Sequence, residues 1–380
     1  MQLGGHKRPI TVVMYNYDGD LIFTASKDSS MAAGDSNITL WLVETGERVG
    51  TYQGHSGAVT SLDITRDSRF LLSGSADGTV RVWEALTGAQ VAVVNTDGNA
   101  PCQSVAWAEG EREFAVVTNK FSAYEPKVRV YGFDPNSPPG SMVGPSRFEF
   151  SIVGERETEC NYTKCAWMPM NDSLLLSMEH GVLRQVDLAT REVKEWSEHS
   201  KYITSISFNS TKTLLLTTSK DATAVLWDVE QMEVRNRYTT DVPINAGALS
   251  NFKEHIILGG GIEARDAATQ GREGGFEVRF FDLVHAKELG RVKGHFSPIN
   301  AVAFSPDGWG FCSGAEEANA RLYKLDTDYL KLGEEDNLDD PALTTAMEDG
   351  TFESLEKEEE EEFAKGKATG EAVVGGGGGK

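Results

Sequence analysis

Short runs of alternating apolar and polar residues, separated by turn residues, recur along the first 330 positions of the chain. The clearest example is Gly54 to Glu84, which contains alternating runs at 59–64 and 70–75, an Asp-Gly turn, and a third run at 79–83. Alternation with a period of two, bounded by turn residues, is typical of antiparallel strands. A fourth run follows at 89–94, so the stretch predicts one unit of four strands.

Histidines that follow a glycine or another turn residue repeat with a nearly constant spacing. From His6 to His55 there are 49 residues, from His55 to His199 there are 144 (three times 48), and from His199 to His295 there are 96 (twice 48). A period near 48 that persists where the histidine is absent indicates tandem copies of one supersecondary unit. Gly-His at the start of the unit and Trp with an acidic residue at the end of its third strand are typical of WD-repeat propeller blades.

A second spacing supports the same unit. The distance from the histidine to an aromatic residue in the third strand is 28 residues in three blades, where the aromatic residues are Trp83, Trp227 and Tyr323. From His6 to Trp41 the distance is 35, and the seven extra residues fall between positions 28 and 41. We expect an inserted surface loop there.

Blades without the Gly-His pair are found by alternation alone. Blade three is predicted at 102–107, 113–118, 127–133 and 148–152, blade four at 162–167, 173–178, 182–188 and 192–196, and blade six between 244 and 292. The chain is therefore predicted to be all-β, a seven-bladed WD-repeat β-propeller over residues 1–332. Closing the ring needs an outer strand for blade seven, because an open ring leaves unpaired strand edges. Residues 1–4 and residues 327–332 are both candidates for this strand.

Four residue types in each well-formed blade can share one chain of buried hydrogen bonds, because each supplies a donor or acceptor that its neighbour lacks. In blade two they are His55, Ser73 or Ser75, Asp77 and Trp83, and in blade five they are His199, Ser219, Asp221 and Trp227. We expect these structural tetrads to stabilise the blades rather than to act in catalysis.

Charge changes the picture at the end of the chain. The 36 basic and 58 acidic residues give a net charge of −22, which argues against a protein that mainly neutralises nucleic-acid phosphates and favours protein partners. Residues 333–380 contain fifteen acidic and four basic side chains, and with so little apolar content they are expected to form a disordered acidic tail. A solubilising role and a regulatory role for this tail both remain open.

Signals for secretion, membrane insertion and catalysis were sought along the whole chain. The four cysteines are scattered and expected to be reduced, and no leader or run of 18 apolar residues is present, so we expect a cytoplasmic protein. No nucleophile elbow, zinc-protease motif or phosphate-binding loop occurs. We expect no enzyme activity, no cofactor and no metal site.

Several segments go beyond the generic repeat. The segments ILGGGIEARDAAT, FEVRFFDL and ELGRVKGHFSPINAVAFSPDG of blades six and seven, with GERVGTYQGHSGAV of blades one and two, closely resemble subunit i of eukaryotic translation initiation factor 3. The resemblance spans residues 1 to about 330, while blades three and four and the 28–41 insertion diverge from the family pattern. It implies a non-enzymatic scaffold that binds the b and g subunits of the factor and reaches the small (40S) ribosomal subunit indirectly. The alternative is a signalling or ubiquitin-ligase adaptor propeller, which would share the repeat features but not these segments.

The resemblance also implies where the b subunit binds. The matching positions are Asp221 and Thr223 in blade five and Asp241 in the linker to blade six. Asp221 has the spacing of a tetrad member, so its carboxylate is expected to have a structural role as well. Asp241 has no such role in the repeat, and we expect Asp241→Lys to weaken b-subunit binding while changing stability by no more than about 0.5 kcal/mol.

Overall fold

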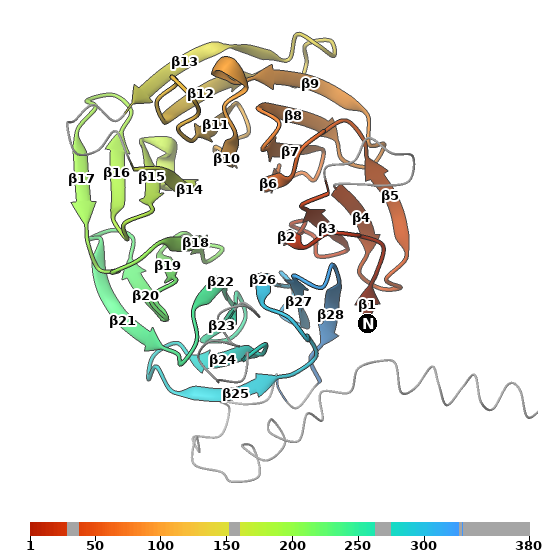
Figure 1. Ribbon diagram of the computed structural model, residues 1–380, viewed down its shortest axis with the longest axis vertical. Helices are drawn as coiled ribbons and strands as arrows, with labels where there is room; N and C mark the ends of the chain where they lie inside the picture. Colours follow the sequence, from red (N-terminus) through yellow and green to blue (C-terminus); the bar gives the residue numbers. More distant parts are fainter. Residues whose placement is uncertain (29–37, 152–159, 263–274, 327–328, 330–380) are drawn as a thin grey trace, which may run out of the picture.

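Seven four-stranded antiparallel sheets form a closed ring around a central axis (Figure 1). The structure is a computed structural model that describes residues 1–28, 38–151, 160–262, 275–326 and 329. Each sheet is one blade, and in six of the blades the strands run in sequence order from the centre of the ring to its rim, while the rim strand of the seventh is β1. The predicted seven-bladed propeller is therefore confirmed. The 28–41 insertion lies largely outside the described residues, as do the boundary at 332 and the predicted disordered tail.

The strand boundaries follow the alternating runs closely, except that β13 begins at Val143, five residues before the run predicted at 148–152. Blade one contains β2 (Ile10–Tyr15), β3 (Leu21–Ser26), β4 (Ile38–Leu42) and β5 (Arg48–Tyr52); blade two contains β6 (Val59–Ile64), β7 (Phe70–Ser75), β8 (Thr79–Glu84) and β9 (Gln90–Asn95); blade three contains β10 (Cys102–Trp107), β11 (Glu113–Thr118), β12 (Lys127–Phe133) and β13 (Val143–Ser151); and blade four contains β14 (Tyr162–Trp167), β15 (Ser173–Met178), β16 (Leu183–Asp187) and β17 (Val193–Trp196). Blade five contains β18 (Ile203–Phe208), β19 (Leu214–Ser219), β20 (Thr223–Asp228) and β21 (Glu233–Thr239); blade six contains β22 (Ile244–Leu249), β23 (His255–Gly260), β24 (Val278–Asp282) and β25 (Glu288–Val292); and blade seven contains β26 (Ile299–Phe304), β27 (Gly310–Ala315), β28 (Ala320–Lys324) and β1 (Gln2–Leu3). Two short 3₁₀ turns, η1 (Asp97–Asn99) and η2 (Pro169–Asn171), complete the elements. No helix among the described residues is long and apolar enough to cross a membrane.

The N-terminal strand closes the ring. β1 pairs with β28, with Gln2 opposite Arg321 and Leu3 opposite Ala320, and it lies at the rim of blade seven in Figure 1. The Met1 ammonium group donates to the Leu322 carbonyl over 2.7 Å, and the Leu322 N–H donates to the Met1 carbonyl over 2.8 Å. Of the two closing strands that the sequence left open, the structure uses the N-terminal one.

A belt of side-chain hydrogen bonds joins neighbouring blades near the axis. In every blade the pairing between the first two strands shifts register around the second residue of the innermost strand. Such a bulge releases one residue from the regular ladder. At five junctions its side chain donates to the first carbonyl of the next innermost strand: Thr11 to Val59 (2.7 Å), Thr60 to Cys102 (2.7 Å), Thr204 to Ile244 (3.1 Å), Asn245 to Ile299 (2.9 Å) and Asn300 to Ile10 (3.1 Å). A threonine or asparagine at the second position of the innermost strand thus forms a hydrogen bond across five of the seven blade junctions.

The hydrophobic core lies between the blades, because each sheet packs its two faces against its neighbours. One cluster joins blades three and four through side chains such as Val130, Tyr162 and Trp167. A second cluster joins blades two and three, where Trp107 lies edge-to-face with both Phe114 and Phe133. All four cysteines are buried in this core.

Candidate partner-binding surface on blades five and six

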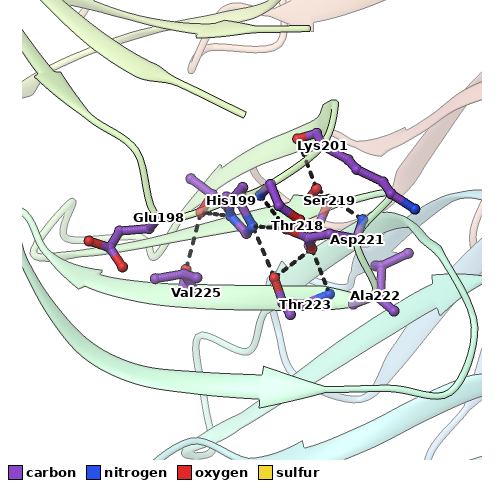
Figure 2. A network of polar contacts seen from close by, with 12 residues as sticks. Glu198, His199, Lys201, Thr218, Ser219, Asp221, Ala222, Thr223 and Val225 are labelled. Atoms are coloured by element: carbon purple, nitrogen blue, oxygen red, sulfur yellow. Dashed lines mark hydrogen bonds and ion pairs between the residues drawn. The ribbon is translucent and has the colours of Figure 1, made fainter. Parts of the chain in front are cut away.

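A chain of hydrogen bonds crosses the buried part of blade five. The Trp227 Nε1–H donates to the Thr217 hydroxyl over 2.9 Å, and that hydroxyl lies 2.8 Å from His199 Nε2. His199 Nδ1 lies 3.0 Å from the Thr223 hydroxyl and 3.4 Å from the Asp221 carboxylate (Figure 2). The Trp227 N–H occupies one acceptor site of Thr217, and the Thr217 O–H can donate to the Val225 carbonyl at 3.5 Å or, over a shorter distance, to an unprotonated Nε2 of His199. This tautomer places the imidazole proton on Nδ1, facing Thr223 and Asp221.

The hydroxyl member of this tetrad is Thr217, and the prediction of Ser219 was wrong. Ser219 Oγ instead donates to the Lys201 carbonyl over 3.0 Å and accepts from the Asp221 N–H over 3.1 Å (Figure 2). Ser219 is the last residue of β19, so its side chain closes the following turn and is too far along the strand to reach the indole. The error arose because Thr217 and Ser219 are two residues apart on the same face of β19, so both positions fit the strand pattern.

Blade two repeats the arrangement with Ser73 as the hydroxyl member. Ser73 Oγ accepts from Trp83 Nε1 over 2.8 Å and lies 2.7 Å from His55 Nε2, while His55 Nδ1 lies 3.1 Å from Asp77. Ser75 accepts from the Asp77 N–H over 3.2 Å, as Ser219 does in blade five. Of the two serines that the sequence left open, the structure places Ser73 between the histidine and the tryptophan.

Blade one has a further tetrad, made by His6, Thr24, Asp28 and Trp41. In blade seven His295, Ser313 and Glu317 make the same contacts, and Tyr323, at the position of the tryptophan, stacks on Phe311. In all four blades the hydroxyl follows the histidine by 18 residues and the acidic residue follows it by 22. The offset of 18 is the sequence signal that identifies Thr217 and excludes Ser219.

The Asp221 carboxylate is buried and hydrogen-bonded inside the blade. Its side chain is 8% exposed, and it accepts from the Ser200 N–H over 2.8 Å, from the Thr223 N–H over 2.9 Å and from the Thr223 hydroxyl over 2.6 Å. Burial raises the pKa of Asp221, but the hydrogen bonds from Thr223 and Ser200 outweigh it and the pKa is lowered overall. Asp221 and Thr223 therefore shape the turn between β19 and β20 and satisfy each other's polar groups.

Asp241 has a structural partner that the sequence did not indicate. Its carboxylate forms an ion pair with Nη2 of Arg279 on β24, and the Arg279 side chain is only 4% exposed whereas that of Asp241 is 65% exposed. Burial raises the pKa of Asp241, but the charge of Arg279, its hydrogen bond and smaller contributions together outweigh burial, and the pKa is lowered overall. The expectation that Asp241 has no structural role was wrong, because its carboxylate pairs with a buried guanidinium. Asp241→Lys would leave two cations facing each other, so it is not a neutral surface change.

The three predicted partner-binding residues lie on adjacent segments. Thr240, which precedes Asp241, donates its N–H to the Ala222 carbonyl over 2.9 Å, and Ala222 lies between Asp221 and Thr223. The turn of blade five and the linker to blade six are thereby joined edge to edge. The Asp241 carboxylate is more accessible than that of Asp221, because its side chain is 65% exposed and that of Asp221 is 8% exposed. The surface therefore offers one exposed anion beside a turn whose polar groups are already hydrogen-bonded.

The chain is similar to one family of proteins along almost its whole described length. The family model EIF3I matches residues 1–335. Eukaryotic translation initiation factor 3 subunit I from Xenopus tropicalis is 36% identical over 332 residues, which is 86% of this chain and 97% of the relative. The subunit I proteins of Homo sapiens (37% over 334 residues, 87% and 97%) and Schizosaccharomyces pombe (35% over 332 residues, 86% and 97%) give the same picture.

Solved structures support the ring architecture independently. The Cps50 (Swd1) β-propeller domain of Myceliophteria thermophila superimposes with a TM-score of 0.67 and covers 84% of this chain and 98% of that domain. Sequence identity with this domain is only 17%, so the likeness concerns the fold alone.

Proposed function

Because the chain belongs to the family of subunit I of eukaryotic translation initiation factor 3, we propose that it is a non-enzymatic scaffold subunit of that factor, acting in the cytoplasm in mRNA translation initiation. The observation that supports this most strongly is the family match from residue 1 to residue 335. A ring stiffened by buried tetrads and an inter-blade belt is suited to holding partners in fixed relative positions.

The b subunit is the partner assigned to the joined surface of blades five and six. Asp241 supplies a carboxylate that is 65% exposed, which can pair with an arginine or lysine of an incoming helix. The buried Arg279 holds this carboxylate from behind, so Asp241 is oriented before the partner arrives. Thr223 and Asp221 form the neighbouring turn, against which the helix packs. Asp221 acts there through the shape of the turn rather than as a free charge.

The g subunit is the second proposed partner, and the small ribosomal subunit is reached through the assembled factor. The net charge of −22 disfavours direct contact with ribosomal RNA phosphates. Recruitment to the small subunit and support of scanning are therefore assigned to the complex, in which this chain holds the b and g subunits together.

The test measures the affinity of the intact chain for the C-terminal region of the b subunit. Asp241→Asn keeps the size of the side chain and removes its charge, and we expect binding to weaken by about tenfold, which corresponds to about 1.4 kcal/mol and to the loss of a charge-assisted hydrogen bond. Asp134→Asn is the matched control, because Asp134 is 54% exposed and faces Arg112 at 3.8 Å in blade three. The control should bind as the parent does.

Salt dependence separates a direct contact from a structural effect. The difference between Asp241→Asn and the parent should shrink as ionic strength rises, because screening weakens an exposed ion pair. Thermal unfolding of both variants identifies any loss of folded protein. If Asp241→Asn binds the b-subunit segment as tightly as the Asp134→Asn control at low salt, the binding surface lies elsewhere on the ring. If neither the b nor the g subunit is recovered with the parent chain, the scaffold proposal fails.

A further inference from the structure

The rim strand of blade two lacks the features that protect the other rims of the ring. A strand at the edge of a sheet presents unpaired N–H and C=O groups, and charged side chains, proline or a very short strand normally keep other chains from pairing with them. β9 has the sequence QVAVVN, with no charged residue and no proline. β1 is only two residues long, and the remaining rim strands all carry charge: Arg48 in β5, Arg147 in β13, Glu195 in β17, Arg235 in β21 and Arg291 in β25.

Every second residue of β9 directs its backbone groups away from the sheet. In the pairing with β8, Val93 lies opposite Arg81, and just beyond the strand the Thr96 N–H donates to the Gly78 carbonyl over 2.9 Å. Hydrogen-bonded and non-hydrogen-bonded positions alternate along an antiparallel ladder. Since Thr96 is in a hydrogen-bonded position, the N–H and C=O groups of Asn95 and Val93 point outward. No backbone hydrogen bond from another segment of the described structure reaches either residue.

The chain itself shows that this edge accepts a further segment. Gly140, in the connection between β12 and β13, donates its N–H to the Val91 carbonyl over 2.7 Å. Val91 is 8% exposed and belongs to the apolar cluster that joins blades two and three, whereas Val93 is 40% exposed. The edge of β9 is therefore covered at Val91 and open from Val93 to Asn95.

The open edge lies across the ring from the surface at Asp241. Blades three and four separate blade two from blade five on one side, and blades one and seven separate it from blade six on the other. Figure 1 shows β9 on the rim and the junction of β21 and β22 on the opposite side of the ring. A segment paired with β9 would not overlap with a helix bound beside Asp241, so the chain can hold two partners at once.

Charge and hydrogen bonding favour a segment of another protein over a second copy of this chain. Two copies that paired rim to rim would bring together chains with a net charge of −22 each, which repel one another. The edge itself carries no charge, so it does not repel an extended segment of a different protein. Such strand addition takes its affinity from main-chain hydrogen bonds and its specificity from alternate side chains, here through a contact with the exposed Val93.

We propose that β9 binds an extended segment of the g subunit, which adds a fifth strand to blade two and hydrogen-bonds to the outward groups of Val93 and Asn95. The proposal rests on the scaffold function proposed above, in which the g subunit is the second partner. It assigns to that partner a short strand with an apolar side chain beside Val93, and it leaves the surface at Asp241 to the b subunit.

Hydrogen exchange at single amides tests the strand addition directly. The intact chain is compared alone, with the g subunit and with the C-terminal region of the b subunit. The amides of Val93 and Asn95 should exchange rapidly in the free chain, because they point outward from the sheet. The g subunit should slow both amides by about tenfold or more, whereas the b-subunit region should leave them unchanged.

Two substitutions at Val93 and one matched control separate the contact from an effect on folding. Val93→Pro removes the outward N–H and keeps the hydrogen bonds to β8, because an edge strand tolerates proline where the N–H faces solvent. Val93→Lys keeps the N–H and adds the charge that β9 lacks. Thr51→Pro is the control, because Thr51 lies opposite Thr39 on the rim of blade one as Val93 lies opposite Arg81 in blade two.

Both Val93 variants should remain folded in thermal unfolding and bind the g subunit about tenfold more weakly, while Thr51→Pro and every affinity for the b subunit stay at the parent value. If the g subunit binds the parent and the Val93 and Asn95 amides still exchange as in the free chain, the strand addition is overturned and the scaffold function stands. If the parent does not bind the g subunit, the proposal fails together with that part of the scaffold function. Protection that appears in the free chain and increases with its concentration would also overturn the proposal, since the occupant would then be a second copy.

Discussion

Replacing Thr217 by valine should break the hydrogen-bonded tetrad of blade five and lower the stability of the protein. Valine has nearly the same shape as threonine and suits a strand, so packing is retained while the hydroxyl is lost. The indole N–H of Trp227 and Nε2 of His199 then lose their shared partner in a site where Trp227 is 1% and His199 is 5% exposed. Each buried polar group left unpaired costs about 1–3 kcal/mol, so for these two groups we expect the free energy of unfolding to fall by about 2–6 kcal/mol.

Urea unfolding followed by tryptophan fluorescence measures this loss, and two companion variants interpret it. Ser219→Ala removes one hydroxyl that serves only the turn, so it should cost about 1 kcal/mol. Thr217→Ser keeps the hydroxyl and should remain closer to the parent than Thr217→Val does. If Ser219→Ala destabilises the protein as much as Thr217→Val, the chain of hydrogen bonds through Thr217 does not contribute as its geometry suggests.

Three other perturbations address the remaining supports of the ring. Asp77→Ala should lower stability by about 1–3 kcal/mol, because it removes the carboxylate facing His55, and an unchanged urea midpoint would contradict this. Deleting residues 1–3 removes β1 and the buried Leu3, and should lower stability by more than about 2 kcal/mol and promote association through the uncovered edge of β28, as seen by gel filtration. Burial lowers the pKa of three tetrad histidines, His55, His199 and His295. Below about pH 6.5 the unfolded chain therefore binds more protons than the folded chain, and the free energy of unfolding should fall on acidification. Asp63 has the opposite effect on the pH dependence of stability, because burial raises the pKa of its carboxyl from 3.8 to about 6 even though the Trp107 and Ile64 N–H groups donate to it. Urea unfolding at a series of pH values should therefore show a steeper loss of stability on acidification for Asp63→Asn than for the parent.

Local patterns predicted most of the fold because a propeller repeats one local unit. Alternation located most of the strands even in blades three and four, where the Gly-His pair is absent. The histidine spacing gave the number of blades. The choice of Ser219 failed because Ser219 and Thr217 lie on the same face of β19, where alternation does not distinguish them. Comparing the offset from histidine to hydroxyl across blades would have resolved it.

The partner of Asp241 could not be found from local sequence. Arg279 follows it by 38 residues, beyond two strands and the 263–274 segment, and neither residue belongs to the repeated tetrad. Arg279 stands in a strand whose neighbours are mostly apolar, and its burial becomes visible only when β24 is placed in blade six. Pairing between a linker and a third strand depends on how consecutive blades meet, which periodicity does not describe.

Blades three and four, like blade six, contain no histidine tetrad among the described residues. The Thr163 hydroxyl bonds to Ser177 within its own blade at 2.6 Å. Large apolar clusters join these blades, where Tyr131 stacks on Phe114 at 5.5 Å, and the buried Trp167 indole donates to the Ala106 carbonyl over 3.0 Å. Apolar packing is non-directional and tolerates substitutions that conserve volume, whereas a tetrad requires four particular side chains. Blades three and four can therefore accept substitutions that conserve volume without opening the ring, whereas in the tetrad blades, among them blade five with its turn beside Asp241, replacing one member leaves buried polar groups unpaired.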